Sequence, residues 1–159
     1  MSHFSSFLSR LFGFPPSPGD RPSWAQPDSG TRPESLIESA RGQGWIGVDL
    51  DGTLAHYDGW EGIDVIGAPI PPMVERVKAW LAEGTEVRIF TARVSGPTQL
   101  RQIATEAIED WCREYIGQVL AVTATKDFGM YELWDDRAVQ VECNTGRRMD
   151  SKPETQWTP

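Results

Sequence analysis

The segment WIGVDLDGT, residues 45–53, holds the clearest evidence for the architecture of this chain. WIGVDL (45–50) is a short apolar run of the kind that forms a buried strand in a parallel sheet. Asp49 comes at the end of this run and Asp51 follows two residues later, so both carboxylates can face one pocket. Gly52 allows the chain to bend sharply there. The segment therefore predicts a buried strand that ends in an acidic turn.

Strands and helices alternate along the rest of the chain. Pro71 and Pro72 open a predicted helix that stops near Gly84, and a longer helix has an apolar face from Leu100 to Tyr115. Four more strands are predicted, at 86–90 (EVRIF), 119–124 (VLAVTA), 131–134 (YELW) and 138–142 (AVQVE). This alternation predicts an α/β fold, a three-layer Rossmann-like domain with about five mostly parallel strands flanked by helices. Ligands bind at the carboxyl ends of the strands in such a sheet.

Composition divides the chain into three parts. Residues 1–44 contain six of the twelve prolines and little apolar material, so we expect a disordered extension there. Residues 45–149 form the predicted domain, and residues 150–159 a flexible polar tail. Within the extension, residues 4–14 include an apolar stripe at helical spacing, which leaves open a helix that docks on a partner. The stripe consists of Phe4, Phe7, Leu8, Leu11 and Phe12.

The net charge is −8, and all of the excess lies after residue 44, where 11 basic side chains accompany 19 acidic ones. Such an acidic domain repels phosphates of nucleic acids, so we expect no nucleic-acid partner. The hydropathy pattern predicts neither a membrane span nor secretion. Cys112 and Cys143 lack the spacing of metal ligands and are expected to be free thiols in a reducing cytoplasm. The oligomeric state is left open.

Polar side chains follow four of the predicted strands. Asp49 and Asp51 follow the first strand, Thr91 the second, Lys126 the third, and Asp135 and Asp136 the fourth. Four carboxylates in one cleft would repel one another strongly unless a cation lay between them. Mg²⁺ takes oxygen ligands and suits a site that also holds phosphate. Thr91 and Lys126 would then offer a hydroxyl donor and a positive charge to the phosphoryl oxygens.

These motifs resemble those of the haloacid dehalogenase (HAD) superfamily, over about residues 45–142. Asp-x-Asp-Gly-Thr after an apolar strand is similar to the first HAD motif, IFTAR to the second, and Lys126 with the acidic pair after YELW to the third and fourth. The resemblance implies a magnesium-dependent phosphohydrolase in which Asp49 attacks phosphorus and becomes an aspartyl-phosphate. It implies that Asp51 protonates the leaving oxygen and then activates water. The implied ligands are Thr91 and Lys126 for the phosphoryl group, and Asp49, the backbone carbonyl of Asp51, Asp135 and Asp136 for Mg²⁺.

The spacing of the motifs leaves no room for a cap domain. Asp49 and Thr91 are 42 residues apart (91 − 49), and Thr91 and Lys126 are 35 apart (126 − 91), enough for one helix and one strand each. The chain therefore resembles the capless branch of the superfamily, with residues 54–67 as a small flap beside the nucleophile. Asp127 stands where some small HAD phosphatases have a proline.

Other polar side chains near these motifs are further candidates. Arg93 could bind a second anionic group of the substrate, and an ordinary salt bridge is the alternative. His56 lies on the flap with Tyr57 and Trp60 and could contact the leaving group, or could simply be exposed. Arg137 follows the acidic pair and is expected to support it rather than to touch substrate.

The function predicted is that of a phosphomonoesterase acting on a small phosphorylated metabolite, such as a nucleotide or a sugar phosphate. One alternative keeps the same site in a phosphotransferase or a phosphatase of nucleic-acid ends, because an open site can admit a large substrate. The other is a non-catalytic phosphate-binding or scaffold protein that docks through residues 4–14.

Overall fold

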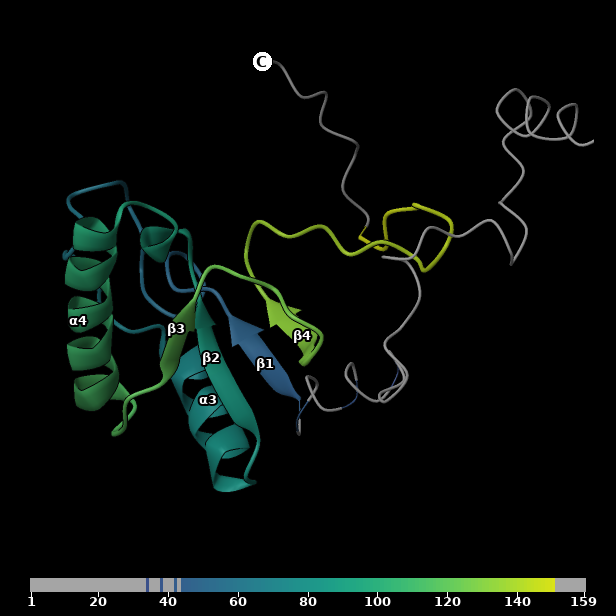
Figure 1. Ribbon diagram of the computed structural model, residues 1–159, viewed down its shortest axis with the longest axis horizontal. Helices are drawn as coiled ribbons and strands as arrows, with labels where there is room; N and C mark the ends of the chain where they lie inside the picture. The colour runs from purple at the N-terminus through teal and green to yellow at the C-terminus, as the bar shows by residue number, and fades with distance from the viewer. Residues whose placement is uncertain (1–33, 35–37, 39–41, 43, 151–159) are drawn as a thin grey trace, which may run out of the picture. The chain divides into compact units, whose positions relative to one another are not determined.

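The computed structural model describes residues 34, 38, 42 and 44–150 (Figure 1). Met1–Ala40 and Arg41–Pro159 separate into two units. In the first unit the described residues, Glu34 and Glu38, are helical and exposed, and every element named below belongs to the second. The apolar stripe at 4–14 and the tail after residue 150 lie outside the described residues. None of the described helices combines the length and apolar character needed to cross a bilayer.

The described part of the second unit alternates strands and helices (Figure 1). Its elements are β1 (Trp45–Val48), α3 (Pro71–Ala82), β2 (Glu86–Phe90), the short 3₁₀ helix η2 (Ala92–Val94), α4 (Thr98–Tyr115), β3 (Ala121–Thr123) and β4 (Met130–Trp134). The two prolines at the start of α3 occupy positions where a missing N–H removes no helical hydrogen bond. The helix stops before Gly84, whose φ of +82° suits a glycine after a helix end. The sequence therefore locates the ends of this helix well.

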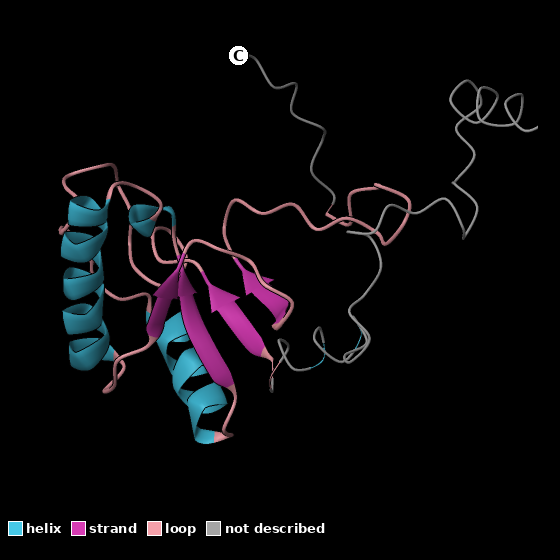
Figure 2. Ribbon diagram, in the orientation of Figure 1, coloured by secondary structure: helices cyan, strands magenta, loops and turns pink. Residues whose placement is uncertain are grey.

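The four strands form one parallel sheet in the order β3-β2-β1-β4 (Figure 2). The central strand β1 pairs with β2 from Trp45 opposite Glu86 to Val48 opposite Ile89. On its other side β1 pairs with β4, which brings Trp134 opposite Val48. The predicted Rossmann-like α/β class is confirmed by this parallel sheet with its flanking helices. All four strands point the same way, so their carboxyl ends lie along one edge.

Both long helices pack on the same face of the sheet. The core side chains of α3 and α4 belong to one buried cluster with the inward side chains of β1 and β2, such as Val48 and Ile89, which are fully buried. Right-handed crossovers that step in one direction, from β1 to β2 to β3, place their helices on one face. The described helices therefore form one layer on the sheet, not the two layers of the predicted three-layer arrangement. This layer supports the sheet whose carboxyl edge carries the candidate site.

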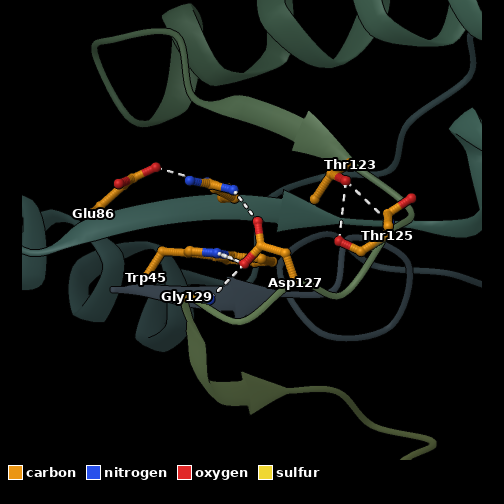
Figure 3. A network of polar contacts seen from close by, with 7 residues as sticks. Trp45, Glu86, Thr123, Thr125, Asp127 and Gly129 are labelled. Carbon is orange, nitrogen blue, oxygen red and sulfur yellow. Dashed lines mark hydrogen bonds and ion pairs between the residues drawn. The ribbon is translucent and has the colours of Figure 1, made fainter. Parts of the chain in front are cut away.

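Residues 124–129 cross the opposite face of the sheet (Figure 3). They join β3 to β4, which lie at opposite edges of a parallel sheet, so this link must pass over β2 and β1. Asp127 holds it there by accepting hydrogen bonds from Trp45 Nε1 (2.8 Å), Arg88 (3.1 Å) and the backbone N–H of Gly129 (2.8 Å). The hydrogen bond from Trp45 is the main reason that the pKa of Asp127 is lowered. Asp127 therefore fixes the path of the segment that contains Lys126.

The structure corrects two of the strand predictions. Residues 138–142 do not form a fifth strand: in the described chain they are a loop, in which Val141 makes an isolated bridge to Arg148. Val139 and Val141 remain about half exposed, so the described chain does not bury the apolar side of this segment. The third strand is also shorter than predicted, Ala121–Thr123 instead of 119–124. The alternation of apolar residues at 138–142 was not enough to form a strand, because a strand also needs a surface to pack on.

Candidate metal and phosphate site

Three carboxylates meet at the carboxyl edge of the sheet. Asp49 directly follows β1, and its backbone N–H donates to the carbonyl of Trp134 at the end of β4 (2.8 Å). The adjacent ends of β1 and β4 thereby bring Asp49 beside Asp135 and Asp136. Each of the three offers an oxygen, and these oxygens all lie within 4.8 Å of one another. The predicted convergence of acids 86 residues apart (135 − 49) is therefore present in the described chain.

The turn after Asp49 fits closely against Asp136. Gly52 has a φ of +91°, and a Cβ added to it would lie 2.9 Å from a carboxylate oxygen of Asp136. Only glycine allows both this backbone conformation and this approach. Thr53 Oγ1 accepts a hydrogen bond from the backbone N–H of Asp136 (2.9 Å). Thr53 thus positions the acidic pair, a role that sequence reasoning missed although its place in Asp-x-Asp-Gly-Thr was a signal.

Asp135 stabilises the turn that follows β4. Its Oδ1 accepts hydrogen bonds from the backbone N–H groups of Arg137 (2.7 Å) and Ala138 (2.9 Å). Such a turn fixes the orientation of the carboxylate. The support expected from Arg137 is therefore given by its backbone.

The carboxyl of Asp49 has a pKa raised to about 7, first because of its burial. The hydrogen bond from the backbone N–H of Leu50 lowers this pKa, and the charges of Asp135, Asp51 and Asp136 raise it further. A carboxylate that is half-buried among other carboxylates is the arrangement that a bound cation stabilises.

Asp51 and Arg93 form a two-armed ion pair. Arg93 donates from Nε to one oxygen of Asp51 (2.7 Å) and from its terminal Nη2 to the other (2.8 Å). Its remaining terminal nitrogen donates to the carbonyls of Gly62 (3.0 Å) and Ile63 (2.9 Å) on the flap. The side chain of Arg93 is only 4% exposed. The geometry thus favours the salt-bridge alternative for Arg93, which holds the flap against Asp51.

Asp51 contributes to the cavity differently from the other three acids. Its carboxylate lines the cavity but is turned toward Arg93, and it does not belong to the cluster of three acids that could hold a metal. The side chain of Asp51 is therefore engaged by Arg93 and is not one of the three clustered carboxylates.

Thr91 is buried at the end of β2 and lines the same cavity. Its Oγ1 accepts a hydrogen bond from the backbone N–H of Arg93 (3.3 Å), so it caps the short helix η2. The hydroxyl proton of Thr91 remains available to an acceptor, because a hydroxyl can donate and accept at once. Capping and phosphate binding are therefore compatible at this position.

Lys126 is not brought to this site. It is exposed and is absent from the residues that line the cavity, because Asp127 draws the 124–129 segment across the face of the sheet (Figure 3). Arg137 lines the cavity instead. In the described chain the contacts of Arg137 are made by its backbone N–H, and no described side chain binds its guanidinium. The sequence pattern pointed to Lys126 and not to Arg137, because the path of the chain after β3 depends on tertiary contacts.

The cavity has a volume of about 620 Å³ and combines a charged wall with an apolar one. The polar and charged lining consists of Asp49, Asp51, Asp135, Asp136, Thr91, Arg93 and Arg137. The apolar wall is formed by Tyr57, Trp60, Ile63, Phe90 and Leu100. His56 lines a neighbouring hollow under the flap and not this cavity. A cavity of this size can hold a small metabolite.

The flap is a loop fixed at its base. His56 N–H donates to the carbonyl of Ala68 (2.8 Å), and Trp111 Nε1 on α4 donates to the carbonyl of Gly67 (2.9 Å). A Cβ on Gly67 would come within 2.0 Å of the His56 carbonyl oxygen, so the two arms of the loop can approach this closely only at a glycine. The expected small flap after the first strand is thus a tethered segment beside the acids.

The fold and the site together define a Rossmann-like α/β protein with a cluster of carboxylates at the carboxyl edge of its sheet. No family model matches the chain, and no curated protein matches it. Among solved structures, a conserved protein from Bacteroides thetaiotaomicron is similar, with 25% sequence identity and a TM-score of 0.43. The match covers 60% of this chain and 78% of that one. The likeness is partial, so the fold assignment rests on the strand order and pairing of this chain.

Proposed function

We propose that this protein is a magnesium-dependent phosphomonoesterase of the capless HAD type. The observation that carries the proposal is the cluster of Asp49, Asp135 and Asp136, whose oxygens lie within 4.8 Å of one another beside Asp51 and Thr91. The order of these residues along the chain supports the same family, because each follows a strand as in the HAD motifs. The acidic domain and the small cavity favour a small phosphorylated substrate.

The donor set fits Mg²⁺. Three carboxylates supply only hard oxygen ligands, and an oxygen-rich site that retains water is what this ion prefers. Asp49, Asp135 and Asp136 would hold the ion, together with the backbone carbonyl of Asp51. When bound, the ion neutralises the acids and the phosphate oxygens, so that an anionic nucleophile can approach an anionic substrate.

In the proposed reaction the carboxylate of Asp49 attacks phosphorus. A bond forms between an oxygen of Asp49 and phosphorus, the ester bond from phosphorus to the leaving oxygen breaks, and Asp51 gives that oxygen a proton. Water then attacks the phosphorus of the aspartyl-phosphate, gives a proton to Asp51, and releases phosphate from Asp49. Arg93 keeps Asp51 at the cavity wall. Each oxygen of Asp51 has a second lone pair that Arg93 does not use, and the transferred proton binds there.

Thr91 and Arg137 are the groups proposed to hold the phosphoryl oxygens. Thr91 offers its hydroxyl proton, and Arg137 offers a guanidinium that no described side chain engages. This assignment replaces Lys126, which is exposed and does not line the cavity.

The proposal is tested by phosphate release from p-nitrophenyl phosphate by the purified full chain. Release is expected with magnesium and is expected to vanish with a chelator or in Asp49→Asn. Glu106→Gln is a matched control, because it removes one exposed carboxylate on α4 and keeps an oxygen that Gln102 can bind. Full activity in Asp49→Asn would remove this residue from the mechanism.

A further inference from the structure

Aromatic side chains at the mouth of the cavity are exposed. Trp60 is 60% exposed and Tyr57 46%, and both lie on the flap that faces the acids. Leu100 at the start of α4, 45% exposed, completes an apolar rim. Large apolar side chains that gather at a cavity rather than in the core mark a surface for a ligand.

Trp60 is held in place from behind. The guanidinium of Arg93 lies over its indole ring, with the Cζ atom 5.0 Å from the ring centroid. Arg93 is itself fixed by Asp51 and by the carbonyls of Gly62 and Ile63. A cation stacked on an aromatic ring orients that ring. The indole is therefore fixed on one face and still largely open to solvent.

Arg93 also links the Trp60 ring to Asp51, the proposed proton donor. Arg93 contacts Asp51 at 2.7 Å on one side and the Trp60 ring on the other. Asp51 is the group that would meet the leaving oxygen. The group attached to that oxygen would thus extend past Arg93 toward Trp60 and Tyr57.

The outer part of the flap is acidic. Asp58, Glu61 and Asp64 are all exposed, and Asp58 and Glu61 line the hollow beside the cavity. Their charges disfavour further phosphates on the leaving group, whether in a nucleoside diphosphate or in a polynucleotide. A flat, uncharged ring suits this surface better than either.

We infer that the flap is a stacking platform, and that the preferred substrates are phosphomonoesters whose leaving group carries one planar ring system, such as nucleoside monophosphates. Trp60 stacks on the ring, Tyr57 lines its side, and the acidic outer flap excludes additional phosphates. This inference rests on the proposed function, because it names the substrate class of the same cavity.

The first test compares kcat/KM for AMP with that for glycerol phosphate, which lacks a ring. In Trp60→Ala the ratio of the two is expected to fall by about 5- to 30-fold, the range for loss of one base–aromatic stack at an exposed position. Trp60→Phe should restore part of the ratio. Phe128→Ala is the matched control, since this exposed aromatic lies outside the cavity, and it should keep the wild-type ratio. An unchanged ratio in Trp60→Ala would overturn the inference.

The second test does not need turnover. Binding of AMP and of glycerol phosphate to Asp49→Asn, with magnesium, is measured by calorimetry, and again after Trp60→Ala is added. AMP is expected to bind more tightly, and only while Trp60 is present. Absence of any magnesium-dependent hydrolysis would end the proposed function but would leave this comparison valid. Equal binding of the two ligands to Asp49→Asn would overturn the inference whatever the hydrolysis shows.

Discussion

Replacing Asp49 by Asn should make the metal-free protein more stable while it abolishes catalysis. Oxygens of Asp49, Asp135 and Asp136 lie within 4.8 Å of one another. Two unit charges at that distance repel by about 1 kcal/mol in water and about 3 kcal/mol at an effective dielectric constant of 20. The substitution removes two of the three repulsive pairs. The full pKa shift of Asp49, from 3.8 to about 7, would correspond to about 4 kcal/mol, most of it from burial of the charge. Because Asp136 is exposed and Asp49 only half-buried, solvent screening reduces this effect, and we expect a net gain of about 1–2 kcal/mol at pH 8.

The gain should depend on pH in a defined direction. The pKa of Asp49 is about 7 in the folded protein, above the ordinary value of 3.8 that applies to the unfolded chain. The folded state therefore binds the proton more tightly, and the stability of the metal-free wild type falls as pH rises from about 4 to about 7. The difference between Asp49→Asn and wild type should be small below about pH 4 and complete above about pH 7.

The assay is thermal unfolding followed by circular dichroism, with a chelator and then with excess magnesium. A gain of about 1–2 kcal/mol corresponds to a rise of about 5–10 °C in Tm for a domain of this size. Magnesium should reverse the order, because it binds the three carboxylates of the wild type more tightly. Glu106→Gln serves as control. If the two variants behaved alike with chelator at every pH, the three acids would not form a repulsive cluster.

Three further predictions follow from the same contacts. Arg137→Ala should lower kcat/KM for aryl phosphate by about 10- to 100-fold, because a charge-assisted contact to the phosphoryl group is lost. Lys126→Ala should leave kcat/KM unchanged. A larger loss of kcat/KM in Lys126→Ala than in Arg137→Ala, measured by steady-state kinetics, would contradict this. Thr53→Val removes the acceptor for the Asp136 N–H and should weaken magnesium binding by about 3- to 10-fold in calorimetry, and equal affinity would dismiss that positioning role. Cys112 is buried, and burial is the first cause that raises its pKa to about 11. Alkylation of the folded protein near pH 8 should therefore modify the exposed Cys143 alone. Mass spectrometry that showed early modification of Cys112 would contradict its burial.

The sequence was most informative where local pattern and tertiary packing agree. EVRIF was predicted as a strand with the bounds that the structure gives, because Val87 and Ile89 face the helices and the charged Glu86 and Arg88 face the other way. The prolines and Gly84 marked the ends of α3 for reasons local to the backbone. The acids at the ends of β1 and β4 were predictable because parallel strands align their carboxyl ends.

The sequence was less informative where the outcome depends on long-range contacts. Lys126 was assigned by its position after β3, but Asp127 fixes that segment through Trp45 and Arg88, 82 and 39 residues away. The pairing of Arg93 with Asp51 spans 42 residues, and nothing local to either residue distinguishes it from substrate binding. Residues 138–142 alternate like a strand, but the described chain provides no surface to bury them.

The central claim is that Asp49, Asp135 and Asp136 share one divalent ion, and magnesium titration by calorimetry tests it most directly. Wild type is expected to bind one ion per chain, and Asp136→Asn to bind it about tenfold more weakly or not at all. Glu106→Gln should match wild type. Magnesium binding that is equally tight in Asp136→Asn and in wild type, or no binding to either, would contradict the account.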